Sequence, residues 1–323
     1  MPESRKKSFD VVGLGVSPVD ILALVSHFPK GDEVQLASVI TTQGGGPVAT
    51  ALVTLARLGS RTAMLDAIGD DWRGKLILDE FRRENVSTDY IQVRAGHTSA
   101  VASILVHQGT GERAIYHFPG NAPELSPDEI PPELIQDSRF LHINGRHWEA
   151  CLKSVSVAKK AGVKISFDGG EGRYRSEINQ LIPEIDIFIA AHQFAQAYTG
   201  MASTHESAQF ILEEGPQLVV ITSGMQGSWI FEKGGTSFHQ PAFQMPKVID
   251  TTGCGDSYHG AFLYSLLNGF PLSHTACFAS AVAALNSQGL GGRAALPDYK
   301  KVIAFISNKC PGEYHFPEVI QRK

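Results

Sequence analysis

Short apolar runs of the kind that form buried strands recur along the chain, and helical patterns separate them. This alternation predicts an α/β fold with a mainly parallel sheet and helices on both of its faces. We expect strands at residues 9–14, 62–68, 140–143, 163–167, 185–189 and 218–222. We expect helices at residues 47–58, 72–84, 149–161, 194–198, 203–213, 257–267, 272–286 and 297–306.

Two regions break this rhythm, because residues 21–40 and 99–118 look like strands without a helix between them. Residues 100–107 are rich in β-formers, residues 108–111 read as a turn, and residues 113–118 return as a second strand. We therefore expect a single domain over residues 1–323, with a small β-sheet lid inserted at about 16–42 and 98–119.

The composition excludes several classes of protein. The net charge of −5 and pI of about 6.2 give no electrostatic case for nucleic acid or an anionic membrane. No apolar run approaches the roughly 20 residues of a membrane helix, and the N-terminus lacks the apolar core of a signal peptide. The four cysteines are widely spaced, which favours a reducing compartment. We expect a cytoplasmic protein without nucleic-acid or membrane partners.

The strongest functional signal is Asp250-Thr251-Thr252-Gly253-Cys254-Gly255-Asp256. It follows an extended-looking apolar run, residues 243–249, and precedes a segment of small and apolar residues. A strand, a glycine turn and a helix in succession direct free backbone N–H groups and the positive end of the helix at an anion. A carboxylate in the first helical turn, Asp256, is suited to take a proton from an attacking hydroxyl. The motif predicts phosphoryl transfer to an alcohol.

Two glycine-rich matches are better explained as ordinary turns. Residues 69–75 fit GxxxxGK, but Leu76 stands where a P-loop requires Ser or Thr. We interpret the segment as a helix N-terminus capped by Asp70 or Asp71. A dinucleotide fingerprint at residues 13–18 fails because Pro18 replaces its third glycine.

Other polar or glycine-rich segments follow strands and are candidates for ligand binding, although each is also compatible with a plain turn, cap or surface position. Asp20 could accept hydrogen bonds from sugar hydroxyls. The candidates are Asp20, Gly44-Gly45-Gly46-Pro47 with Thr50, Asn144-Gly145-Arg146, Asp168-Gly169-Gly170 and Thr222-Ser223-Gly224-Met225-Gln226-Gly227.

In their order and spacing these segments resemble the ribokinase, or PfkB, family of carbohydrate kinases over residues 9–305. The family has two signatures. One is the glycine pair Gly45-Gly46 with the helix that follows it as far as Ala56-Arg57-Leu58-Gly59, and the other is the 250–256 motif. The resemblance implies a ribokinase-like, Rossmann-like fold with a lid, and ATP-dependent phosphorylation of a sugar hydroxyl. It also implies Mg²⁺ as a cofactor and allows a monovalent cation.

The resemblance assigns roles to individual residues. Asp256 would be the general base, and the amides of Gly253, Cys254 and Gly255 would form the anion hole. The substrate-binding residues would be Asp20, Gly45, Gly46 and Thr50, together with the candidates Arg146 and Asp168. The nucleotide-binding residues would be Thr222, Gly224, Gly227 and Thr252, with Asn286 and Gly289 near the adenine.

The chain also departs from the family pattern. Thr50 stands where many members have Asn, and Cys254 replaces the usual alanine. Ala191-His192-Gln193-Phe194 replaces the Asn-x-x-Glu motif that organises magnesium, so we assign no metal ligand. Gly145-Arg146-His147 and the segment 291–297 resemble ketohexokinases and sulfofructose kinases, which favours a ketose-like substrate. Arg146 and Arg293 either recognise an anionic substituent or lie at the surface.

Two other functions remain open at this point. A nucleoside kinase would use the same motifs with an aromatic pocket for a base, to which Phe118 and Trp148 could contribute. A catalytically weak sugar-binding or regulatory protein would explain the missing Asn-x-x-Glu but not the retention of Asp256. Exposed lid edges also favour a homodimer formed through the lid.

Overall fold

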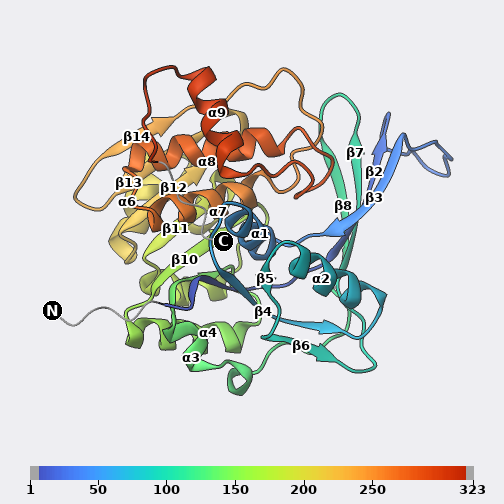
Figure 1. Cartoon of the computed structure of the whole chain (residues 1–323), viewed down its shortest axis with the longest axis horizontal. Helices are drawn as coiled ribbons and strands as arrows, with labels where there is room; N and C mark the ends of the chain where they lie inside the picture. The colour runs from blue at the N-terminus through green and yellow to red at the C-terminus, as the bar shows by residue number, and fades with distance from the viewer. Residues whose placement is uncertain (1–6, 318–323) are drawn as a thin grey trace.

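The computed structural model describes residues 7–317, and its centre is a large, mostly parallel sheet (Figure 1). In spatial order the strands are β14 (Ser237–Gln240), β13 (Ser228–Glu232), β12 (Leu218–Thr222), β11 (Ile187–Ala191), β10 (Lys164–Gly169), β9 (Ser138–Ile143), β1 (Phe9–Leu14), β4 (Thr62–Gly69) and β5 (Val86–Ser87), with β6 (Ile91–Arg94) also paired to β4. The strands from β12 to β5 run parallel, whereas β13 and β14 form an antiparallel hairpin at one edge.

Helices cover both faces of the sheet, as the sequence predicts. One face packs against α1 (Pro47–Arg57), α2 (Trp72–Arg83), α7 (Cys254–Leu267), α8 (Leu272–Asn286) and α9 (Tyr299–Lys309). The other packs against α3 (Pro132–Gln136), α4 (Trp148–Ala161), α5 (His192–Thr199) and α6 (Thr204–Glu214). Short 3-10 turns occur at Pro127–Glu129, Ser176–Gln180, Ile182–Glu184 and Gly224–Gln226. Successive strand residues such as Val11 and Val12 belong to different core clusters, because side chains alternate across a sheet.

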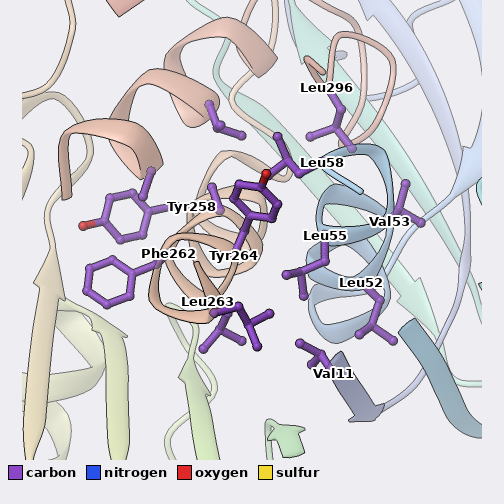
Figure 2. Packing of buried hydrophobic residues seen from close by; sticks show 14 of the residues in the cluster. Val11, Leu52, Val53, Leu55, Leu58, Tyr258, Phe262, Leu263, Tyr264 and Leu296 are labelled. Atoms are coloured by element: carbon purple, nitrogen blue, oxygen red, sulfur yellow. The ribbon is translucent and has the colours of Figure 1, made fainter. Parts of the chain in front are cut away.

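The helix that begins in the glycine motif is anchored in the centre of one core. Figure 2 shows Leu263 and Tyr264 of α7 beside Leu52 and Leu55 of α1. At Gly260 an added Cβ would lie 2.4 Å from the carbonyl oxygen of Ala51, so glycine is what allows the two helices to approach this closely. Because α7 is buried along most of its length, its N-terminus is held in a fixed position.

A separate four-stranded sheet forms the lid, in the order β3 (Val39–Gly44), β2 (Val19–Val25), β7 (Val101–His107) and β8 (Arg113–Phe118). It projects to one side of the main domain (Figure 1) and has a small apolar cluster of its own, which includes Leu22 and Ile104. The β7–β8 hairpin contacts the main domain, because Arg113 Nη1 donates a 2.7 Å hydrogen bond to Thr251 Oγ1.

Two expectations from the sequence need correction. Residues 243–249 form no strand; they run irregularly beside the end of α8, where the Ile249 amide donates to the Ser287 carbonyl at 2.9 Å. Pro246 interrupts the apolar run and lacks the N–H that a strand ladder requires. The hairpin β13–β14 was not expected, although Gly234 and Gly235 stand in the turn that joins its two strands.

The interpretation of the GxxxxGK match as a helix start is confirmed, because Asp71 caps α2 by accepting a 3.0 Å hydrogen bond from the Gly74 amide. Within residues 7–317, no helix is both long enough and apolar enough to span a membrane.

Candidate active site

The glycine motif forms a left-handed turn at the N-terminus of α7. Gly253 is the N-cap residue with φ +72°, and a Cβ there would lie 2.5 Å from the Cα of Gly292, so both conformation and space require glycine. At Gly255 an added Cβ would meet no atom within 4 Å, so this side of the turn is open. Among residues 7–317 the amides of Gly253 and Gly255 have no hydrogen-bond partner, whereas that of Cys254 donates weakly to the Thr251 carbonyl at 3.3 Å. An anion could therefore be bound here by at least two free N–H groups.

Asp250, a fully buried residue without a predicted role, fastens this turn to the neighbouring loop. Its Oδ1 accepts hydrogen bonds from the amide and the hydroxyl of Thr252 at 2.8 and 2.7 Å, and its Oδ2 accepts from the Gly291 amide at 2.7 Å. Asn286 is also fully buried and donates to the Gly292 carbonyl at 2.9 Å. Thr252 and Asn286 thus take part in the internal bonding of the turn, and their nucleotide contacts stay predictions.

Asp256 lies in the first turn of α7, where several charges act on it. Burial raises the pKa of Asp256 above its ordinary value, and the nearby Asp168 carboxylate also raises it. The guanidinium groups of Arg173 and Arg113 oppose this shift. Neither arginine was a candidate from the sequence, since Arg113 arrives from the lid and Arg173 from the loop after β10. A carboxylate with a raised pKa at an open helix N-terminus is suited to general-base chemistry.

Asp20 lies at the start of the lid strand β2 and is 6 % exposed. A Cβ on Gly45 would lie 2.3 Å from both carboxylate oxygens of Asp20, so only glycine allows the two segments to meet. Burial raises the pKa of Asp20 to about 7; Arg293 opposes the shift, and the negative charge of Asp256 adds to it. The structure therefore brings Asp20, the Gly45 turn and Asp256 into one neighbourhood from three separate parts of the chain.

Arg293 is neither at the surface nor free to bind an anion, which corrects the expectation from the sequence. It is 3 % exposed, and its Nη1 forms an ion pair with Glu80 Oε1 at 2.8 Å. Its Nη2 donates to the Gly45 carbonyl at 2.7 Å, and its Nε donates to Thr50 Oγ1 at 3.1 Å. Glu80 also accepts from the Gly44 amide at 2.5 Å. Arg293 thus fixes the Gly44–Gly46 turn, and the Thr50 hydroxyl is engaged in the same network.

Arg146 follows β9 and is partly exposed, with no ion pair or side-chain hydrogen bond among the described residues. Burial lowers the pKa of His117 on the lid, and the positive charges of Arg146 and Arg173 lower it further. The neighbouring His147 is held in place, because its Nε2 is hydrogen-bonded to Asp66 Oδ1 at 2.9 Å and its Nδ1 accepts from the Leu125 amide at 3.2 Å. Arg146, Arg173 and His117 therefore form a basic group between the lid and the sheet edge.

The other predicted residues occupy different environments. Gly224 is exposed with φ +49° and no atom within 4 Å of an added Cβ, so a ligand can approach its backbone. Close packing requires glycine at two other positions. A Cβ added to Gly227 would lie 2.1 Å from the Gln240 carbonyl oxygen, and one added to Gly289 would lie 2.7 Å from Ala295 Cβ. Thr222 donates a long 3.4 Å hydrogen bond to the Ala190 carbonyl.

Asp168 is 2 % exposed and faces His142 and His259, with its Oδ1 3.8 Å from His259 Nε2. Its contact with substrate stays a prediction. In place of Asn-x-x-Glu, Gln193 is exposed and Phe194 is buried in the core, so this stretch offers no carboxylate to magnesium.

Comparisons with known proteins agree with this geometry. The model of the pfkB family carbohydrate kinases matches residues 8–298. A 5-dehydro-2-deoxygluconokinase of Shouchella clausii is 28 % identical, over 94 % of this chain and 97 % of its own. An uncharacterized sugar kinase of Archaeoglobus fulgidus is 30 % identical, over 75 % of this chain and 98 % of its own.

Solved structures give the same fold. A ribokinase from Thermotoga maritima is 25 % identical with a TM-score of 0.80, and covers 93 % of this chain and 100 % of its own. The structure of a putative ribokinase from Agrobacterium tumefaciens, 24 % identical, has a TM-score of 0.86 over 93 % of this chain and 98 % of its own. Together with the glycine turn at the start of α7, these matches show that the chain belongs to the pfkB family of carbohydrate kinases and is a sugar kinase with the ribokinase-like fold.

Proposed function

We propose that this kinase transfers the γ-phosphoryl group of ATP directly to a hydroxyl of an anionic keto-sugar. Asp256 removes the proton of that hydroxyl, and the amides of the 253–255 turn hold the transferring phosphoryl group. The observation that carries the proposal is the open N-terminus of α7, with two unpartnered amides and a carboxylate of raised pKa in its first turn. Asp20, Gly45 and Gly46 hold the other hydroxyls of the sugar.

The basic group of Arg146, Arg173 and His117 supports an anionic substrate. Arg146 and Arg173 form no ion pair within the described residues, and the positive charges of both act on the lid histidine, so an anion bound between them would be stabilised by both guanidinium groups. The relatives named 5-dehydro-2-deoxygluconokinase point the same way, because a gluconate derivative carries a carboxylate. We therefore assign the carboxylate, or a comparable acidic substituent, to these arginines.

ATP would bind along the carboxyl ends of β11 and β12, past the exposed turn at Gly224, with its terminal phosphate at the turn before α7. A homologous fold has been solved with ATP and Mg²⁺ bound. Since residues 191–194 supply no carboxylate, Mg²⁺ would be held mainly by the nucleotide phosphates and water. Its role when bound is to neutralise the phosphate charge.

Replacing Asp256 with Asn tests the assignment of the base. Because Asn cannot accept the proton, kcat should fall roughly 10²- to 10⁴-fold. Dissociation constants for sugar and ATP should stay within a few fold of wild type, because the turn itself is unchanged. Asp128→Asn, at an exposed carboxylate, is the matched control and should leave kcat unchanged. Wild-type turnover by Asp256→Asn would refute the role.

A substrate panel tests the acidic substituent. ATP consumption is measured with keto-sugar acids, the corresponding neutral ketoses and nucleosides. We expect kcat/KM to be highest for a keto-sugar acid, and Arg146→Gln or Arg173→Gln to lower it selectively for the acid. Equal losses for acidic and neutral sugars would contradict this assignment, and preference for a nucleoside would replace the proposed substrate class.

We infer, further, that two copies associate through their lids. Ile40 is 70 % exposed, and Ile115 and Tyr116 of β8 are 50 and 69 % exposed, which is unusual for large apolar residues on one small sheet. Sedimentation velocity should give a dimer for the wild-type chain and a monomer for Ile40→Glu. A wild-type monomer at micromolar concentration would exclude this association.

A further inference from the structure

Three buried side chains from separate elements meet beneath the base. His142 comes from β9, Asp168 from the end of β10, and His259 from α7 one turn beyond Asp256. They are 0, 2 and 4 % exposed. One nitrogen or carboxylate oxygen of each lies within 4.8 Å of the others, and Asp168 Oδ1 lies 3.8 Å from His259 Nε2.

The cluster lacks the hydrogen bonds that buried polar atoms normally have. His142 Nε2, Asp168 Oδ2 and His259 Nδ1 are all without a partner within residues 7–317. His142 Nδ1 contacts Ser166 Oγ at 3.2 Å, which leaves its Nε2 directed away from that partner. Buried polar atoms without a partner are costly, so three of them on neighbouring side chains favour a further partner for this cluster.

The spacing is wrong for direct hydrogen bonds but close to that of a coordination site. The 3.8 Å between the Asp168 oxygen and the His259 nitrogen exceeds a hydrogen bond. An ion about 2.0–2.2 Å from each ligand atom requires those atoms to be about 3–4 Å apart. The longest separation in the cluster, at most 4.8 Å, would have to shorten by roughly 1 Å, which a modest side-chain rotation provides.

We propose that His142, Asp168 and His259 bind a divalent transition-metal ion such as Zn²⁺, at a site separate from the Mg²⁺ that accompanies ATP. Two imidazoles and one carboxylate form a donor set suited to zinc, iron or cobalt, whereas Mg²⁺ prefers oxygen ligands. The ion would link β9, β10 and α7 below the catalytic turn. This inference does not depend on the proposed substrate.

The metal content of the protein tests the site. Full-length chain without an affinity tag is dialysed against EDTA, then loaded with Zn²⁺ or Co²⁺ in the presence of excess Mg²⁺, and gel-filtered. We expect about one Zn²⁺ per chain by elemental analysis, a visible Co²⁺ absorption band typical of low coordination number, and a higher Tm with metal than without.

Variants locate the ion. Asp168→Asn and His259→Gln should each lower Zn²⁺ affinity at least about 10-fold, whereas His205→Gln, at an exposed histidine of α6, should retain full loading. The proposal would be overturned if the triple variant His142→Gln, Asp168→Asn, His259→Gln bound as much Zn²⁺ as the wild type. The proposal would also be overturned if the wild-type chain retained less than about 0.1 Zn²⁺ per chain, which would indicate that water fills the cluster.

A second measurement does not require any variant to fold. X-ray absorption of the zinc-loaded wild-type chain should show two imidazole nitrogens bound to zinc. A spectrum without imidazole ligands would overturn the proposal.

Discussion

Arg293 offers the sharpest test of how the Gly44–Gly46 turn, for which we propose sugar binding, is held in place. Its side chain is 4 % exposed, and its guanidinium group bonds Glu80, Thr50 and the Gly45 carbonyl. Arg293→Met keeps most of the side-chain volume and removes the charge, so Glu80 is left as a buried carboxylate whose main partner is the Gly44 amide. The variant therefore separates the contribution of the ion pair from that of packing.

The magnitude follows from burial. Removing one partner of a buried ion pair costs roughly 3–5 kcal/mol, because the other charge remains without compensation. With an unfolding entropy of about 2.1 cal/mol/K per residue, this chain should lose about 4–7 °C in Tm. Adding Glu80→Gln to Arg293→Met removes the stranded charge, so the double variant should be more stable than the single one.

Equilibrium urea unfolding gives the free energies, and steady-state kinetics give KM for sugar and for ATP. We expect KM for the sugar to rise while KM for ATP changes little, because Arg293 holds Gly45 and not the nucleotide turn. Arg82→Met is the control, since the Arg82–Asp79 pair is 61 and 51 % exposed and should contribute less than about 1 kcal/mol. The reasoning would be refuted if Arg293→Met lowered the free energy of unfolding by less than about 1 kcal/mol and the double variant were no more stable than the single one.

The remaining predictions concern the glycine turn and the pH dependence. Gly253→Ala should lower the Tm and kcat together, because φ is +72° and the new Cβ would lie 2.5 Å from Gly292 Cα; an unchanged Tm would argue against this strain. Gly255→Val should leave the Tm within about 1 °C but lower kcat at least about 10²-fold, since its side chain would fill the open side of the anion turn. The pKa of Asp20 is raised to about 7 in the folded protein, so protonated Asp20 stabilises the fold. This contribution to the free energy of unfolding, on the order of 4 kcal/mol, is fully present below about pH 4 and is lost as the pH rises through 7. When the free energy of unfolding is measured from pH 5 to 8, Asp20→Asn should lack the part of the decrease that Asp20 causes. A pH profile identical to that of the wild type would show that Asp20 is not the group responsible.

Much of the fold could be predicted because its signals are local. The apolar runs of β1 and β12 match the predicted bounds, and α8 begins and ends at the expected residues. The lid hairpin from Val101 to Phe118 followed from β-rich runs on either side of a glycine turn. The strand predicted at residues 243–249 was wrong, because an apolar run forms a strand only where a neighbouring strand can pair with it.

The local structure at the candidate site could be predicted where it depends on consecutive residues, whereas contacts between distant residues could not. The 250–256 motif specified a turn and a helix start, and both are present. Arg173 and Arg113 had no comparable signal, since each is a single arginine in a loop or on a lid strand. The pairing of Arg293 with Glu80 joins residues far apart in the chain, so an arginine that looks exposed from its neighbours is in fact buried.

The sequence by itself therefore determined the order of strands and helices, the glycine turn before α7 and the place of Asp256 in the first turn of that helix, because backbone conformation and short-range spacing decide them. Only the tertiary structure decided which charges surround Asp256, that Arg146 and Arg173 lie near the lid residue His117, and that His142, Asp168 and His259 meet below the turn. The physical reason is that burial and electrostatics depend on distances in space, and these are set when separate strands, helices and the lid pack together.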